Sequence, residues 1–142
     1  MRRDLIVASF ALALTLSFGT TAVRAAAAVT GAAAQEAGGA ISQCTQTKQG
    51  QPLIDCVGDA MAGLASAIDR GDIPKLAPQV VQLAGQAATI RGKPKAPALG
   101  VLNRVLSVAR GFAAKSSGEG QQAYNNVAGA FARAIAAVER RG

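Results

Sequence analysis

The chain contains no histidine, and aromatic residues make up only 4% of it. Without histidine, the usual general base of Ser/His/Asp and Cys/His catalysis is missing. The commonest metal ligand and any histidine-ligated haem are missing with it. No Ser-x-x-Lys sequence supplies a lysine base in its place. The sequence therefore predicts a non-enzymatic protein with no cofactor and no metal site.

Strand patterns are also absent, because no stretch alternates apolar and polar residues over the length of a strand. Apolar residues instead recur every three or four positions, which is typical of helices that bury one face. Short segments of turn-forming residues separate these stretches. The pattern predicts an all-α fold, a small antiparallel helical bundle of about four to five helices.

The first 25 residues follow the order of a cleavable secretory signal peptide. Arg2 and Arg3 precede an apolar run over residues 5–18, and residues 23–25 place small or apolar side chains before a cut after Ala25. A membrane anchor is the alternative, but a bilayer span takes about 20 apolar residues. The leader predicts a periplasmic or secreted protein that meets the membrane only transiently, during export.

Cleavage after residue 25 leaves one domain of ordinary size. Residues 26–32, rich in alanine and glycine, are predicted as a flexible lead-in, and residues 33–142 as a single helical domain. Two Pro- or Gly-containing segments, residues 93–97 and 116–120, are predicted as a linker and a loop. The apolar stripes predict helices over residues 33–46, 52–68, 78–90, 98–112 and 124–138.

The two cysteines, Cys44 and Cys56, are predicted to form one disulfide between the first two helices. In an oxidising compartment, two cysteines of a small exported domain most simply pair with each other. Closing a loop of this length stabilises the fold by about 3 kcal/mol in the chain-entropy model. The alternatives are two thiols or an intermolecular bridge.

Charge is distributed unevenly along the chain. Residues 26–72 carry two basic and five acidic side chains, whereas residues 73–142 carry ten basic and two acidic ones. This asymmetry indicates an anionic partner for the second part, such as a phosphorylated lipid, an anionic polysaccharide or an acidic protein of the cell envelope. The alternative is that the charge serves solubility.

The densest basic cluster is Arg91, Lys93 and Lys95, which stand in a proline-containing turn. Such a cluster can contact phosphate or carboxylate groups, so these residues form a candidate patch for an anionic partner. A solvated loop without a binding role is the alternative. Nucleic acid is not expected as the partner, because the few aromatic residues after the leader lie at core positions and offer no platform for stacking bases.

Asp55 and Asp59 lie four residues apart on one face of the second predicted helix. They could share a cation, but acids early in a helix more often complement its positive end. The sequence thus predicts an exported, non-enzymatic protein that acts by interaction with an envelope protein or an anionic envelope component. The alternative is a periplasmic carrier of a small apolar or anionic ligand, held in a cavity between the apolar stripes.

Overall fold

A computed structural model describes residues 27–69 and 79–142 of the chain, which form five helices and no strand. The all-α prediction is therefore confirmed. The predicted signal peptide, residues 1–25, lies outside the described residues. The helices, in chain order, are residues 27–47 (here helix 27–47), α2 Gln51–Asp69, α3 Gln79–Ala88, α4 Lys95–Lys115 and α5 Gly118–Arg141.

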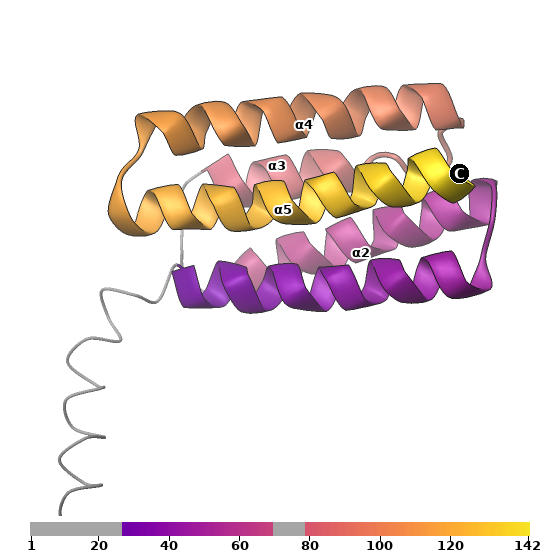
Figure 1. Ribbon diagram of the computed structural model, residues 1–142, viewed down its shortest axis with the longest axis horizontal. Helices are drawn as coiled ribbons and strands as arrows, with labels where there is room; N and C mark the ends of the chain where they lie inside the picture. Colours follow the sequence, from indigo (N-terminus) through magenta and orange to yellow (C-terminus); the bar gives the residue numbers. More distant parts are fainter. Residues whose placement is uncertain (1–26, 70–78) are drawn as a thin grey trace, which may run out of the picture.

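The five helices lie side by side along the long axis of the bundle, and consecutive helices run in opposite directions (Figure 1). Because their number is odd, helix 27–47 and α5 run in the same direction. Both ends of this parallel pair are hydrogen-bonded. The Ala27 N–H donates to Oε2 of Glu119 at 3.1 Å at one end, and the Gly50 N–H donates to the Arg141 carbonyl at 2.7 Å at the other.

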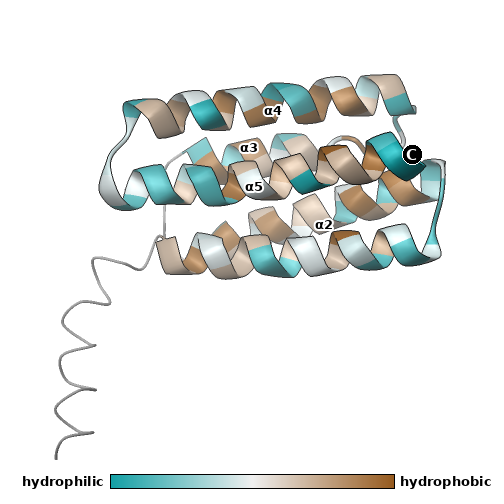
Figure 2. Ribbon diagram, viewed as in Figure 1, coloured by the Kyte–Doolittle hydropathy of each residue, from teal (hydrophilic) through white to brown (hydrophobic). Residues whose placement is uncertain are grey.

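The core lies between the apolar stripes of all five helices, which alternate with polar stripes along each ribbon (Figure 2). Many of its residues are alanine, which lets the helices approach closely. The rings of Phe112 and Tyr124 stack with their centroids 5.2 Å apart and join α4 to α5. The largest fully buried side chains are those of Phe131, Leu53, Ile54, Met61, Leu64, Ile68, Ile90 and Leu102.

Helix 27–47 begins earlier than predicted, so residues 27–32 form its first turns and not a flexible lead-in. Alanine has the highest helix propensity, and contacts with α5 fix these turns in place. The Asn126 side-chain amide donates to the Ala27 carbonyl at 3.2 Å and to Oγ1 of the buried Thr30 at 3.0 Å. Because Asn126 lies far away in sequence, helical spacing alone could not reveal this docking.

Two predicted connections are shorter in the structure than expected. The sequence predicts a linker over residues 93–97, but α4 begins at Lys95 and includes Pro97 in its first turn. Proline is tolerated there because the first N–H groups of a helix have no partner within it. Likewise, α5 begins at Gly118, so only Ser116 and Ser117 of the predicted loop 116–120 separate α4 from α5. None of the described helices is both long and apolar enough to span a bilayer.

Candidate functional site

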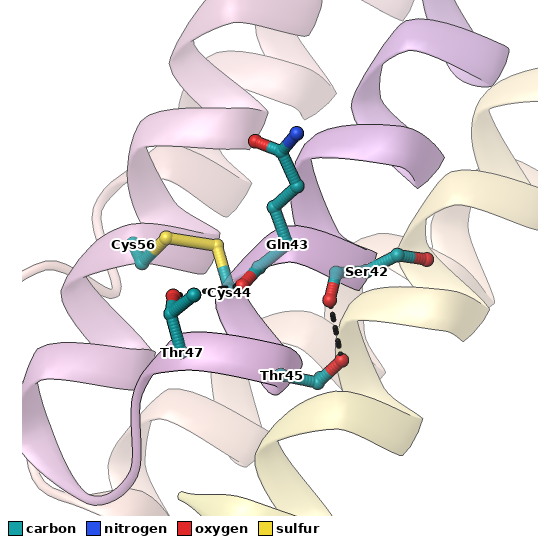
Figure 3. Close-up of a disulfide and its surroundings, with 6 residues drawn as sticks. All are labelled: Ser42, Gln43, Cys44, Thr45, Thr47 and Cys56. Carbon is teal, nitrogen blue, oxygen red and sulfur yellow. Dashed lines mark hydrogen bonds between the residues drawn. A yellow bond between two sulfur atoms is a disulfide. The ribbon is translucent and has the colours of Figure 1, made fainter.

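The predicted disulfide is present and joins the first two described helices (Figure 3). Cys44, near the end of helix 27–47, bonds to Cys56 in the second turn of α2, with an S–S distance of 2.06 Å and Cα atoms 5.8 Å apart. Cys44 is buried and Cys56 is partly exposed. The bond closes the turn between the two helices, and it is typical of proteins that fold in oxidising compartments.

Arg91, the first residue of the predicted basic patch, is held against α2. Its guanidinium Nη1 lies 3.2 Å from Oδ1 of Asp59 in an ion pair, and its Nε donates to the Ala88 carbonyl at 3.2 Å. Gly58 makes this approach possible, because a Cβ there would overlap the Arg91 side chain and lie 3.2 Å from its backbone nitrogen. The charge of Arg91 is thus directed to a carboxylate of its own chain.

Asp55 fixes the turn that follows Arg91. Its Oδ1 accepts the Gly92 N–H at 2.7 Å and the Gln51 side-chain amide at 3.1 Å. That amide also donates to the Lys93 carbonyl at 3.0 Å. The hydrogen bond from Gly92, then the one from Gln51, hold the pKa of Asp55 below its ordinary value, and the Arg91 charge adds to this effect while desolvation opposes it. Together with the Arg91–Asp59 pair, these bonds form what we call the turn clamp.

The remaining patch residues have other surroundings. Lys95 Nζ donates to the Glu139 carbonyl at 2.9 Å, where a cation complements the negative end of α5. The Lys93 ammonium has no ion pair or hydrogen bond with a described residue. The structure therefore brings Arg91, Lys93 and Lys95 to one end of the bundle, but it gives two of the three side chains partners within the fold.

Asp55 and Asp59, two of the acidic residues of α2, have roles that the sequence pattern did not indicate. Asp55 and Asp59 lie beyond the first turn of α2, so they do not complement its positive end. Both instead bind the segment that follows α3, as part of the turn clamp. The described residues also contain no group of three or more Cys, Asp or Glu side chains that could hold a metal ion.

A different set of basic residues lines a groove between the parallel helices 27–47 and α5. We call it the seam groove; its volume is about 520 Å³. Small and apolar residues form its floor, and hydroxyl and amide side chains form its rim on helix 27–47. The residues that line it are Gly38, Ile41, Ser42, Thr45, Gln46, Arg133, Ala136, Ala137, Arg140 and Arg141.

The seam groove is positively charged, and the described residues that line it supply no counter-charge. Arg133, Arg140 and Arg141 line it, and none of the described residues in its lining is acidic. All three arginines are exposed. In the described part of the chain, the one ion pair is that of the turn clamp, so none of these three guanidinium groups is paired with a carboxylate.

Arg133 occupies its position because of a glycine on the facing helix. Gly38 is buried, and a Cβ at this position would overlap Nη1 of Arg133. The guanidinium therefore lies directly on the backbone of helix 27–47. An arginine offers five N–H donors in a planar fork that matches phosphate and carboxylate oxygens.

The groove extends in both directions along the seam. Towards the start of α5, Arg133 also lines a hollow of about 250 Å³ with Asn125 and Asn126. Towards the end of α5, Arg140 and Arg141 line an open hollow of about 640 Å³. Shared arginines thus connect three consecutive hollows along α5.

The rim on helix 27–47 is turned away from the disulfide. Figure 3 shows Ser42 and Thr45 on the side that faces α5, whereas Cys44 points towards Cys56 on α2. The Thr45 hydroxyl donates to the Ser42 carbonyl at 2.7 Å. The Ser42 hydroxyl has no partner among the described residues and is available to a ligand.

Sequence reasoning missed the seam groove, although one signal was present. Arg133 and Arg140 are seven residues apart, which places them on one face of a helix. Nothing in the local sequence shows that Gly38 and Ser42 lie opposite that face. The linear density of charge pointed to residues 91–95 instead, where acidic residues of α2 lie close by.

A second groove, of about 500 Å³, lies on the other side of helix 27–47, against α2. The disulfide forms part of its wall, since both Cys44 and Cys56 line it. Glu36, Asp59 and Lys48 supply charges of both signs at its rim. Its apolar lining consists mainly of small residues, namely Ala33, Ala37, Ala40, Ala60, Gly63 and Leu64.

Comparison of the chain with models of known protein families, with curated proteins and with solved structures finds no match. The two grooves and the charges that line them are therefore the features from which a function can be argued.

Proposed function

We propose that this protein is an exported, non-enzymatic interaction protein of the bacterial cell envelope, and that it binds an anionic component in the seam groove. The observation that carries the proposal is the set of three exposed arginines, Arg133, Arg140 and Arg141, in a groove whose described lining contains no acidic residue. Guanidinium groups form strong, often bidentate hydrogen bonds with phosphate and carboxylate groups. An anionic ligand would supply the counter-charge that the described residues do not.

Export is supported by two independent features. The leader of residues 1–25 has the order of a secretory signal peptide, and a bond such as Cys44–Cys56 typically forms and persists in oxidising compartments. We place the protein in the periplasm or among secreted proteins on this basis. Its partner is then a component that is accessible from outside the cytoplasm.

Site-specific crosslinking in the envelope tests the proposal. A photoreactive residue at Ser42 lies in the seam groove, whereas one at Ser107 lies on the exposed face of α4. We expect a defined conjugate from position 42 only. The conjugate should disappear when Arg133 and Arg140 are both changed to Glu.

The matched control reverses two exposed charges on α4, Arg104→Glu with Arg110→Glu. This variant should retain the conjugate from Ser42, since neither arginine lines the seam groove. Equal crosslinking from positions 42 and 107, or equal loss in both double variants, would contradict a specific site in the groove.

A carrier of a small apolar ligand is the second candidate, and the groove against α2 favours it. Binding sites of this kind are mainly apolar and have volumes of about 300–1,000 Å³. Native mass spectrometry of the purified protein should then show a co-purifying small molecule, and Gly63→Leu, which fills the groove, should remove it. A clean apo mass with no thermal shift across a lipid panel would refute the carrier function.

A further inference from the structure

The positions of the arginines also restrict the chemistry of the ligand. Arg133 and Arg140 are seven residues apart on α5, and a helix rises 1.5 Å per residue, so their Cα atoms are separated by about 10 Å along the axis. Both line the same section of the groove. Because Nη1 of Arg133 lies against Gly38 on the facing helix, a phosphate bound there would reach Arg140 only if one of the two long side chains swung towards the other. An elongated molecule could contact both guanidinium groups at once.

The groove between the two arginines suits an uncharged spacer. The buried Ile41 and Ala137 form its floor there, and the exposed Ala136 adds a methyl group beside them. Its rim carries the Ser42 hydroxyl and the Gln46 amide. These groups can contact carbon atoms and hydroxyl groups, but none of them neutralises a charge. The ligand should therefore carry its anionic groups at its two ends.

The geometry points to a ligand with two phosphate groups about 10 Å apart, joined by a neutral spacer, and bound with one phosphate on Arg133 and the other on Arg140. This inference rests on the proposed anion-binding function and specifies its ligand. Phosphate suits both positions because the guanidinium fork can donate two parallel hydrogen bonds to its oxygens. Arg141, next to Arg140, adds a second cation at that end.

A series of alkane-α,ω-bisphosphonates tests the spacing on the full exported protein. Propane-, hexane- and octane-bisphosphonate carry the same charged groups at increasing separation, and hexylphosphonate supplies a single group. We expect the hexane or octane compound to bind with a Kd about tenfold lower than hexylphosphonate, because the second contact becomes intramolecular. Propane-bisphosphonate, which is too short to bridge the arginines, should bind more weakly than the longer compounds.

Variants locate the two contacts. Arg133→Gln or Arg140→Gln should each reduce the affinity for the longer bisphosphonate to within about twofold of that for hexylphosphonate. Gly38→Ala keeps every charge but displaces the Arg133 guanidinium, and it should also abolish the preference for the longer spacers. The control pair Arg104→Gln with Arg110→Gln removes two charges on α4 and should leave the preference intact.

Vesicles distinguish a lipid headgroup from a soluble source of the phosphates. If the ligand is a lipid, vesicles of phosphatidylcholine that contain lipid A, whose two phosphates stand at opposite ends of a neutral disaccharide, should bind the protein, and octane-bisphosphonate should displace it. If the ligand is soluble, these vesicles should bind no more protein than pure phosphatidylcholine does, while the bisphosphonate preference remains. Vesicle binding that the bisphosphonate does not displace would overturn the groove as the phosphate site.

The outcomes separate this inference from the proposed function. Binding that needs Arg133 and Arg140 but ignores spacer length would overturn the two-phosphate ligand and leave anion binding in the groove in place. Binding that is the same in the groove variants and in the α4 control would overturn both.

Discussion

Two arginines of this bundle each lie across a glycine of a neighbouring helix, and their surroundings differ. Arg91 lies against Gly58 of α2, where Asp59 pairs with its guanidinium at 3.2 Å. Arg133 lies against Gly38 of helix 27–47, in a groove without an acidic residue among its described lining. The same local arrangement therefore holds a turn in one region and presents a cation to solvent in the other.

The two arginines also differ in how closely their backbones approach the glycine. At Gly58, the Arg91 backbone nitrogen would lie 3.2 Å from an added Cβ, so the whole turn packs against the glycine. At Gly38, only side-chain atoms of Arg133 come close. The contact between Arg91 and Gly58 is therefore part of the packed backbone. The contact between Arg133 and Gly38 can change without moving the backbone. Nearby carboxylates and backbone proximity thus distinguish a structural arginine from one that is available for binding.

The largest effect is expected from removal of the disulfide, which links the helix that carries Gly38 to the helix that carries Gly58. Replacing Cys44 and Cys56 together by serine should lower the free energy of unfolding by about 3 kcal/mol, because the unfolded chain regains the entropy of the open loop. Chemical denaturation measures this change, and the reduced wild-type protein should show a similar loss. An unfolding midpoint equal to that of the oxidised protein would contradict the prediction.

Substitution of the two glycines by alanine tests the comparison directly. Gly58→Ala should destabilise the fold by more than about 1 kcal/mol, because the Arg91 turn must shift in a packed region. Gly38→Ala should leave stability unchanged or raise it by up to about 1 kcal/mol, since alanine favours the helix and only a flexible guanidinium must move.

Thermal or chemical unfolding of the two variants side by side gives the result. A loss of stability of the same size in both would show that Arg133 is as firmly built into the fold as Arg91, and the distinction between the two regions would fail.

Much of the fold could be predicted from the sequence, because it depends on local patterns. Helical spacing indicated all five helices, and an exported chain with two cysteines indicated the Cys44–Cys56 bond. Helix ends were less accurate. The start of helix 27–47 depends on Asn126 of α5, and the start of α4 depends on how a proline fits into a first turn.

The candidate site was harder to predict, because it depends on which helix faces are opposed. The density of charge near Arg91 was visible in the sequence, but the acids that bind this segment belong to α2. Conversely, Arg133 has no other charged residue close to it in the sequence. It becomes part of a groove only through the parallel packing of α5 on helix 27–47. A prediction from the sequence would require the register between these two helices, which the short-range pattern does not contain.

The smallest expected effect concerns Asp55, which holds the turn clamp through the Gly92 N–H. Its pKa in the folded protein lies below the ordinary value of 3.8, first because of that hydrogen bond and then because of the one from Gln51. A lowered pKa stabilises the fold above the pKa of the unfolded chain, and this contribution disappears as the pH falls through the folded pKa. Asp55→Asn should therefore be slightly less stable than wild type near neutral pH, because the amide oxygen still accepts the Gly92 N–H but carries no charge. Unfolding curves recorded from neutral to strongly acidic pH measure the stability of both proteins, and the two free energies of unfolding should converge in acid. A difference in stability that stays constant or widens there would mean that the carboxylate charge does not hold the turn.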